Sequence, residues 1–435
     1  MDDFLNIDPN EPLYMYCRNA TNREDDTFVG IKSEHIENKT IISIHFPLGY
    51  KISQDDEVLR DEIIQLMSVL NEYNDQQSVI DEIQPDQLLK TVSFPVQAYL
   101  TVILDYLNNG YYQIKEDMYV QGTSGAISWS QTIKKEDPIA MKSGFIYQKY
   151  RVKHHSETDK DLINEISKYC VYQSMLRLGW VYKLPLPPKP VMTRELPIYG
   201  QYLDGMIYKT NKDEEKRIFK AMSRILNFEN TNNDSSEFYF GTNRFEYIWE
   251  RLIQATYGNK DKEYYFPKTK WLLSFGRDRA NAALEPDTVM GKGDDLYILD
   301  AKYYKYGETR IPSDLPDSSS INKQISYGEY VAVNDKFKAE RDAGMEIYNA
   351  FLMPYNAEQE IYSQITDNYF SVGEAVADWK QSTESYQRVQ GILVDIKFLI
   401  GNNCKPNQSE ITKLAEAIKK SIENNNTRNT KGQGN

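Results

Sequence analysis

The sequence predicts an α/β fold, because segments with helical spacing alternate with short strand-like runs. Leu296–Tyr304 and Val389–Leu399 are rich in apolar residues, as buried strands are. Phe245–Tyr257 and Ile321–Val333 instead have the spacing of helices. The chain has 435 residues, of which 40% are hydrophobic and 26% charged, so it can bury a core and form two or three domains.

The overall charge and the cysteines exclude several classes of protein. With 64 Asp and Glu against 51 Lys and Arg, the net charge of −13 excludes a protein that coats nucleic acid through bulk positive charge, although a local basic groove remains compatible with it. No segment approaches the roughly 20 apolar residues of a transmembrane helix, and the N-terminus does not resemble a signal peptide. The three cysteines are too dispersed for a zinc site or a disulfide framework. We therefore expect a cytoplasmic protein without a membrane partner.

The first part of the chain mixes strand-like and helical segments. Ile41–Phe46 is β-branched and reads as a strand, whereas helical spacing occurs in Glu57–Tyr73, Val96–Leu107 and Asp161–Leu178. The following segment, Leu184–Pro190, is rich in proline, which ends helices and central strands. We therefore predict a separate α+β N-terminal domain over residues 1–183 and a connector over residues 184–198. A proline-rich loop within one domain is the alternative.

The second part of the chain is predicted to form one α/β domain over residues 199–404. Glu214–Leu226 reads as a further helix, Ala350–Met353 as a strand and the Asn-rich run Asn227–Glu237 as a loop. Residues 405–435 are expected to be a C-terminal helix followed by a disordered tail from Asn424, because Asn, Lys, Thr and Gly dominate there. Trp129 and Trp249 are expected in the core.

The most informative pattern is Glu285-Pro286-Asp287, followed after twelve residues by Asp300-Ala301-Lys302. Side chains alternate along a strand, so Asp300 and Lys302 point the same way. A turn at Gly291–Asp295 would fold the strand that begins near Asp287 back beside them. Two convergent carboxylates, with the Ala301 carbonyl as a further ligand, suit Mg²⁺. A metal there can lower the pKa of a bound water, and Lys302 can offset charge on a phosphate. A surface hairpin with solvated Asp and Lys is the alternative.

Two flanking helices could complete this site. Phe245–Glu250 supplies glutamates on a helix upstream, and Lys323–Tyr327 lies on a helix downstream, where it could reach a phosphate or a metal-bound water.

These motifs resemble a known family. Asp287 with Asp300-Ala301-Lys302 is similar to the PD-(D/E)xK nuclease core. Ile298–Tyr304, followed by Ile321–Tyr327, resembles the LlaJI-type and McrC-like restriction endonuclease subunits, and Gly125–Lys134 resembles an element that precedes the nuclease in that group. The resemblance covers about residues 110–400.

The resemblance implies a PD-(D/E)xK restriction-endonuclease-like core, with a mixed central sheet flanked by helices, that cleaves double-stranded DNA with Mg²⁺, for which Mn²⁺ would substitute. Asp287 and Asp300 would be metal ligands and Lys302 the catalytic lysine. Glu246 would be the third carboxylate, with Glu250 one turn later as the alternate, and Gln324 is a weaker carry-over. The resemblance also implies a McrB-like GTPase partner in phage defence. This chain has no GxxxxGK[ST] loop of its own.

DNA binding by an acidic chain needs local basic surface. Residues 260–279 hold six basic and three acidic residues, interleaved with aromatic ones. They are either a DNA-facing strip or an ordinary solvated strand pair. Tyr147–His155 is a second basic and aromatic strip, which a solvated strand explains more simply.

Three functions remain open from the sequence. The leading one is a Mg²⁺-dependent endonuclease subunit of a restriction system, driven by a GTPase partner. A self-sufficient homodimeric endonuclease is the second. A non-catalytic adaptor for a motor protein is the third, although an adaptor has no chemical need for Asp287, Asp300 and Lys302 together.

Overall fold

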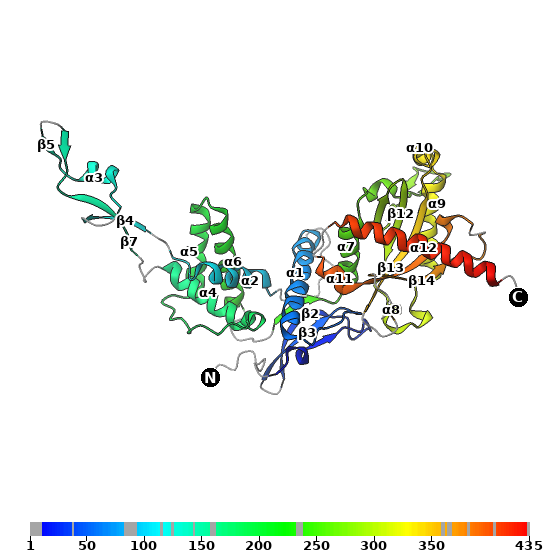
Figure 1. Ribbon diagram of the computed structural model, residues 1–435, viewed down its shortest axis with the longest axis horizontal. Coiled ribbons are helices and arrows are strands. Elements are labelled where there is room, and N and C mark those ends of the chain that lie inside the picture. Colours follow the sequence, from blue (N-terminus) through cyan, green and yellow to red (C-terminus); the bar gives the residue numbers. More distant parts are fainter. Residues whose placement is uncertain are drawn as a thin grey trace. The chain divides into compact units, whose positions relative to one another are not determined.

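The computed structural model describes residues 11–36, 39–81, 94–113, 116–122, 126–141, 144–156, 162–231, 238–357, 362, 368–380, 383–402 and 406–432 (Figure 1). The chain forms two compact units. Unit 1 combines Met1–Ser93 with Ser236–Asn435, and unit 2 is Phe94–Ser235. The chain therefore leaves unit 1 once and returns to it.

Unit 1 holds two larger sheets, a small hairpin and the helices around them. Its strands are β1 (Cys17–Asn19), β2 (Val29–Ile36), β3 (Lys39–Phe46), β8 (Phe238–Thr242), β9 (Lys270–Trp271), β10 (Arg279–Ala280), β11 (Thr288–Lys292), β12 (Asp295–Ala301), β13 (Ile347–Tyr355), β14 (Tyr369–Ala375) and β15 (Val389–Asp395). Its helices are α1 (Asp56–Asp81), α7 (Phe245–Tyr257), α8 (Tyr306–Thr309), α9 (Ser318–Val333), α10 (Lys338–Asp342), α11 (Ile396–Gly401) and α12 (Gln408–Gly432). Short 3-10 turns include η4 (Lys262–Tyr265).

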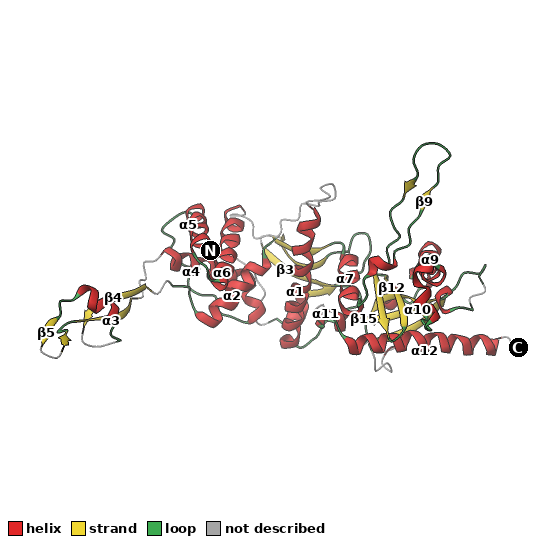
Figure 2. Cartoon of the chain, turned by 90° about the horizontal axis from the view of Figure 1, so that it is seen from above, coloured by secondary structure: helices red, strands yellow, loops and turns green. Residues whose placement is uncertain are grey.

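A five-stranded mixed sheet is the centre of unit 1, in the order β11-β12-β13-β15-β14. The three inner strands are parallel, and the edge strands β11 and β14 run antiparallel to their neighbours. Helix α9 packs against β12, β13 and β15, whereas α12 packs against β11, β14 and β15. These two helices lie on opposite sides of the sheet (Figure 2). The predicted α/β fold is confirmed.

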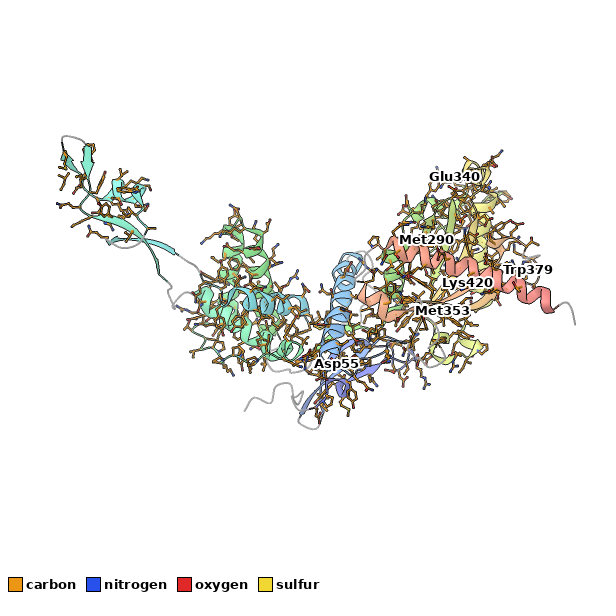
Figure 3. The ribbon with its side chains drawn as sticks, viewed as in Figure 1. Asp55, Met290, Glu340, Met353, Trp379 and Lys420 are labelled. Atoms are coloured by element: carbon orange, nitrogen blue, oxygen red, sulfur yellow. The ribbon has the colours of Figure 1, made fainter. Side chains whose placement is uncertain are left out.

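The inner strands are apolar because both faces of the sheet are covered. Every residue of β13 is buried, as are the central residues of β12. Met290 in β11 and Met353 in β13, both labelled in Figure 3, are fully buried in this core. On the α9 side, Ile298 packs in one cluster with Tyr327 and Val331 of that helix. Asp317 caps the start of this helix, because its carboxylate accepts a hydrogen bond from the Ser320 N–H at 2.9 Å.

A second sheet of unit 1 has the order β1-β3-β2-β8 and joins the start of the chain to residues just before α7. Gly30 of β2 pairs with Gly241 of β8. A side chain on Gly30 would lie 2.1 Å from the Phe240 carbonyl oxygen, so this close pairing requires glycine. Just after β3, the Leu48 N–H donates to the hydroxyl of Tyr303, which follows β12, at 2.6 Å. The first residues therefore belong with the central sheet.

Unit 2 is mainly helical. Its elements are α2 (Val96–Asn109), β4 (Glu116–Gly122), α3 (Trp129–Lys135), β5 (Ile139–Met141), β6 (Gly144–Ile146), β7 (Tyr150–Ser156), α4 (Leu162–Leu178), α5 (Leu196–Lys209) and α6 (Asp213–Thr231). Helices α2, α4 and α6 pack together around Phe219, Met222 and Ile225 of α6. Between them, Arg177 forms a buried two-pronged ion pair with Glu229, at 2.8 and 3.0 Å. Tyr99 also donates to Glu229.

The structure divides the chain differently from the predicted domains. The proline-rich segment is extended, but it connects α4 to α5 within unit 2, as the loop alternative had it. The predicted connector over residues 184–198 also runs into α5, and the predicted nuclease domain over residues 199–404 begins inside unit 2. The physical reason is the pairing of β8 with β2, which joins segments about two hundred residues apart.

Most predicted elements lie where the spacing placed them, with the following exceptions. The strand predicted over Val389–Leu399 ends at Asp395, and the chain continues as helix α11, where Asp395 accepts a hydrogen bond from the Lys397 N–H at 2.9 Å. The predicted loop Asn227–Glu237 is helical as far as Thr231, and its remaining residues lie outside the described part of the chain. The predicted disordered tail from Asn424 instead continues helix α12 to Gly432, whose apolar side includes the buried Leu414 and Ile418. Trp249 is buried as expected, whereas Trp129 is 55% exposed. Among the described helices, none has both the length and the apolar character needed to cross a membrane.

Candidate active site

The β11–β12 hairpin brings the predicted carboxylates together. Thr288 pairs with Leu299, so Asp287, directly before β11, lies beside the end of β12. The Ala301 N–H donates a hydrogen bond to Asp287 Oδ2 at 2.8 Å, and the Asp287 and Asp300 carboxyl groups are hydrogen-bonded to each other. Asp300 is only 3% exposed and forms an ion pair with Lys302. The turn residue Gly293 adopts φ +61°, which favours glycine.

Three carboxylates act on one another at this place. Burial, together with the charges of Asp300 and Glu250, raises the pKa of Asp287 to about 8. Burial and the charge of Asp300 also raise the pKa of Glu250, against the opposing effect of Lys302 and Lys262. Such mutual repulsion is unfavourable for folding unless a proton or a cation compensates it.

Lys302 is the cation within this group of carboxylates. Burial lowers the pKa of Lys302, but its ion pair and hydrogen bond with Asp300 outweigh that effect, so the pKa lies above its usual value. Its backbone N–H donates to the Leu352 carbonyl of β13 at 2.8 Å, which fixes the position of the residue beyond the end of β12. Its ammonium group also lies 5.8 Å from the centre of the Phe351 ring.

Helix α7 contributes Glu250 to the carboxylates, and not the favoured Glu246. Glu246 is 42% exposed at its side chain and pairs with Arg244 at 3.2 Å. Glu250 is half-buried and interacts electrostatically with Asp300, Asp287 and Lys302. The rotation of the helix follows from the buried Trp249, whose indole N–H donates to the Leu352 carbonyl at 3.1 Å. The structure thus places the alternate glutamate where the favoured one was expected.

Gln324 supports β12 from the α9 side. It is fully buried, and its amide donates to the Ile298 carbonyl at 2.7 Å. One turn later on the same helix, the Tyr327 hydroxyl donates to the Glu285 carbonyl at 2.8 Å. Gln324 therefore contacts the strand that carries Asp300, and no contact with the carboxylates is seen in the described part of the chain.

The donor set suits a hard cation, because Asp287, Asp300 and Glu250 offer only carboxylate oxygens near one another. Among the described residues, no three His, Cys, Asp or Glu side chains stand in a ready-made metal-binding group. The two aspartates in contact are thus the fixed part of any such site, and Glu250 faces them from α7. Ala301, between Asp300 and Lys302, is 5% exposed, with its N–H bound to Asp287.

Two contributions to the site were not predicted from the sequence. Lys262 of η4 places its ammonium group 3.5 Å from the Asp287 carbonyl, and its charge acts on Glu250. Tyr303, directly after Lys302, is buried and accepts the Leu48 hydrogen bond, while the Asn22 amide donates to its carbonyl at 3.1 Å. Lys262 was part of the predicted basic strip, but no sequence pattern indicated that its side chain points towards Asp287 and Glu250. The contacts of Tyr303 depend on long-range pairing.

The predicted basic strips form two different structures. Residues 260–279 include η4 and most of a hairpin whose strands are β9 and β10. Tyr147–His155 falls largely on β7, which pairs with β4 in unit 2.

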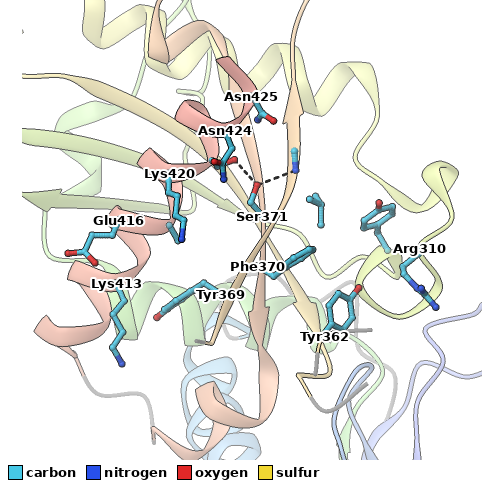
Figure 4. A pocket seen from close by; sticks show the side chains of 15 residues that line it. Arg310, Tyr362, Tyr369, Phe370, Ser371, Lys413, Glu416, Lys420, Asn424 and Asn425 are labelled. Atoms are coloured by element: carbon cyan, nitrogen blue, oxygen red, sulfur yellow. Dashed lines mark hydrogen bonds between the residues drawn. The ribbon is translucent and has the colours of Figure 1, made fainter. Parts of the chain in front are cut away.

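A cavity of about 640 Å³ opens elsewhere in unit 1, between α12 and the edge strand β14 (Figure 4). Arg310, Lys413 and Lys420 bring positive charge to its lining, and Tyr362 and Phe370 bring aromatic surface. In its lining, the Ser371 hydroxyl lies 2.6 Å from that of Ser421. None of the carboxylates near Lys302 lines this cavity.

The fold and site together define an α/β protein with two aspartates and a lysine at the ends of two neighbouring strands and a glutamate that faces them from helix α7. The model of the LlaJI restriction endonuclease family matches residues 28–375, which is most of the chain. The chain therefore belongs to the LlaJI restriction endonuclease family, and the predicted family is confirmed. The match begins earlier than the resemblance, which started near residue 110, and so includes β2, β3 and β8 of the second sheet, whereas β1 precedes it. No curated protein matches the chain.

Proposed function

We propose that this protein is a Mg²⁺-dependent DNA endonuclease of a prokaryotic restriction system, with the five-stranded sheet as a PD-(D/E)xK core. Membership of a restriction endonuclease family implies DNA cleavage in restriction defence. The observation that carries the finer proposal is the contact between Asp287 and Asp300, with Lys302 paired to Asp300 and Glu250 facing them. Like charges crowded at a partly open position favour a site for a divalent cation.

Asp287 and Asp300 would hold the metal, with Glu250 as the third carboxylate and the Ala301 carbonyl as an additional ligand. Bound there, Mg²⁺ would lower the pKa of a coordinated water and stabilise charge on the scissile phosphate. Mn²⁺ would substitute, since it also accepts carboxylate oxygens.

Lys302 would act as a cation rather than as a base. Its pairing with Asp300 outweighs the effect of burial and keeps its pKa above the usual value, so it holds its proton at neutral pH. A protonated lysine beside the phosphate offsets the charge that develops during attack by water. Asp300 orients the ammonium group, and the backbone bond to Leu352 fixes its origin. Gln324 would keep β12 in position through the Ile298 carbonyl.

Two further proposals concern the energy source for cleavage and the subunit composition of the enzyme. A McrB-like GTPase partner would supply any nucleotide-driven step, because the chain lacks a GxxxxGK[ST] loop. A self-sufficient homodimer would cleave without it. A non-catalytic adaptor would need only the fold. It would have no chemical use for the group of carboxylates, which is unfavourable for folding.

The test is plasmid cleavage in Mg²⁺ by the wild type and by Lys302→Ala, each alone and with GTP plus lysate from cells that express the neighbouring genes. Cleavage by the wild type alone favours the self-sufficient enzyme. Cleavage that needs lysate and GTP favours the GTPase-driven subunit. In both cases Lys302→Ala should be inactive. Cleavage that never depends on Lys302 would contradict the proposed site and favour the adaptor.

A further inference from the structure

A long exposed hairpin connects η4 to the candidate active site. It runs from Pro267 to Leu284 and is called here the 267–284 hairpin. At its base, the Leu284 N–H donates to the Pro267 carbonyl at 2.9 Å, and higher up the Asn281 N–H donates to the Thr269 carbonyl at 3.0 Å. It stands out from the body of unit 1, near the label β9 in Figure 2. Its second arm leads directly to Asp287.

The exposed surface of this hairpin is unusual for a soluble protein. Every residue from Lys268 to Ala282 is exposed. Around its turn the side chains are apolar and unprotected, with exposed fractions of 61% for Trp271, 69% for Leu272, 46% for Leu273 and 91% for Phe275. Isolated hairpins are marginally stable, and exposed apolar side chains that lie together commonly mark an interaction surface. The hairpin therefore has the character of an element that becomes covered by a partner.

The charge of the hairpin indicates the nature of that partner. Four basic residues stand against the single acidic Asp278, in a chain whose net charge is −13. Asp278 is engaged with the turn, where it accepts a hydrogen bond from the Leu273 N–H at 3.2 Å. Within the described ranges, no ion pair is formed by any of the four cations, which are Lys268, Lys270, Arg277 and Arg279. An anionic partner would therefore meet uncompensated positive charge.

The shape of the hairpin fits a groove of duplex DNA. The major groove, about 12 Å wide and 8.5 Å deep, admits a two-stranded β-ribbon. From Pro267 to Phe275 an extended arm spans about 25 Å at roughly 3.3 Å per residue, which exceeds the depth of the groove. Cations on the arms would meet the phosphates at the rim while the apolar tip meets the bases. Proteins that bind the minor groove, the other groove open to the hairpin, frequently insert apolar wedges of this kind between base steps.

We propose that the 267–284 hairpin enters a groove of duplex DNA beside the candidate active site, with its basic arms on backbone phosphates and Phe275 against the bases. This inference rests on the proposed nuclease function, because it names how the substrate would be held. It assigns to the hairpin a binding role that is separate from the chemistry at Asp287 and Asp300. Phosphate contacts would position the duplex, and contacts of the tip would unstack or read bases.

The test measures binding of the full chain to a fluorescent duplex of mixed sequence, in EDTA so that no cleavage follows, over a series of salt concentrations. Lys270→Ala/Arg279→Ala removes two cations and should weaken binding at least about 10-fold at low salt. It should also reduce the slope of log affinity against log salt by about 2, because each phosphate contact contributes about 0.9. The matched control Lys220→Ala/Arg224→Ala, on the exposed face of α6, should change neither quantity.

A second variant separates the tip from the arms. Phe275→Ser should weaken binding about 10-fold, as loss of an aromatic contact with a base does, without changing the salt slope. Tyr208→Ser, at a side chain that is 92% exposed, is its matched control and should bind as the wild type does. Circular dichroism should show unchanged folding in all four variants, since their side chains are exposed.

The outcomes distinguish this inference from the proposed function. If the wild type binds duplex DNA and both hairpin variants bind equally well, the hairpin role is wrong and the nuclease proposal stands. If the wild type does not bind duplex DNA in EDTA, the role proposed for the hairpin is contradicted, whereas the plasmid-cleavage test in Mg²⁺ decides the nuclease proposal separately. If sedimentation velocity shows a dimer that Phe275→Ser converts to a monomer, while DNA affinity is unchanged, the hairpin instead joins two copies of this chain.

Discussion

Both units bury carboxylates. In unit 2 the buried carboxylate is paired with a cation, whereas in unit 1 several carboxylates share one paired cation. In unit 2, Glu229 receives two hydrogen bonds from Arg177 and one from Tyr99. In unit 1, Asp287 and Asp300 meet each other and Glu250, with Lys302 as the paired cation. In the first arrangement, the charges of Arg177 and Glu229 compensate each other within the chain. The second leaves excess negative charge that only something outside the chain can neutralise.

The two groups differ in whether the chain itself compensates the buried negative charge. Burial lowers the pKa of Arg177, but its hydrogen bonds with Glu229 outweigh this effect and raise the pKa, so Arg177 stays charged and fixed. The pKa of Asp287 is instead raised to about 8, first by burial and then by the charge of Asp300. A chain keeps such an unfavourable arrangement where function requires it. We therefore expect substitutions at the two places to act in opposite directions on stability.

The largest effect should follow from breaking the paired group. Glu229→Ala leaves Arg177 charged and buried, and should lower the free energy of unfolding of unit 2 by about 3–5 kcal/mol. Urea denaturation measures this loss. Glu215→Ala, which removes the partly exposed partner of the exposed Lys212, is the control and should cost about 1 kcal/mol or less. Equal losses in the two variants would contradict the structural role given to Glu229.

The second effect concerns which glutamate of α7 belongs to the site. Glu250→Gln should lower the rate of DNA cleavage about 100-fold, since it removes a carboxylate that faces Asp300. Glu246→Gln, one turn earlier, should change the rate less than about 3-fold, because Glu246 pairs with Arg244 at the surface. Single-turnover rates of both variants give the comparison. A larger loss in Glu246→Gln would restore the assignment made from the sequence.

The third effect is a gain of stability in metal-free protein. Asp287→Asn keeps an acceptor for the Ala301 N–H and removes a charge, so it should raise Tm by roughly 2–6 °C at pH 8. Because the folded pKa of Asp287 lies above its ordinary value of 3.8, wild-type stability is fully present below about pH 4 and is lost as pH rises towards 8. The gain in Asp287→Asn should therefore vanish near pH 4. A lower Tm at pH 8 would show that Asp287 serves folding.

Elements with strong local patterns were predictable, whereas their long-range partners were not. The hairpin from Asp287 to Lys302 follows from strand alternation and from the glycines of its turn, and α7 begins and ends where its spacing placed it. The pairing of β2 with β8 has no local signal, so the proline-rich segment was taken for the boundary instead.

The choice between the two glutamates likewise depends on long-range contacts. Glu246 and Glu250 are four residues apart and share one face of α7. Which of them faces Asp300 depends on how Trp249 and Phe245 pack against the sheet and Tyr303. That packing involves β13 and the end of β12, which no pattern within the helix reveals. The site residues on the β11–β12 hairpin, namely Asp287, Asp300 and Lys302, could be predicted without such information.

The central claim is that the carboxylates at the ends of β11 and β12 are kept for metal-dependent DNA cleavage. Plasmid cleavage in Mg²⁺ by Asp300→Asn, under whichever conditions support wild-type cleavage and with Tm recorded on the same samples, tests it most directly. The account predicts no detectable cleavage together with a Tm at or above that of the wild type. Cleavage at the wild-type rate would contradict the claim.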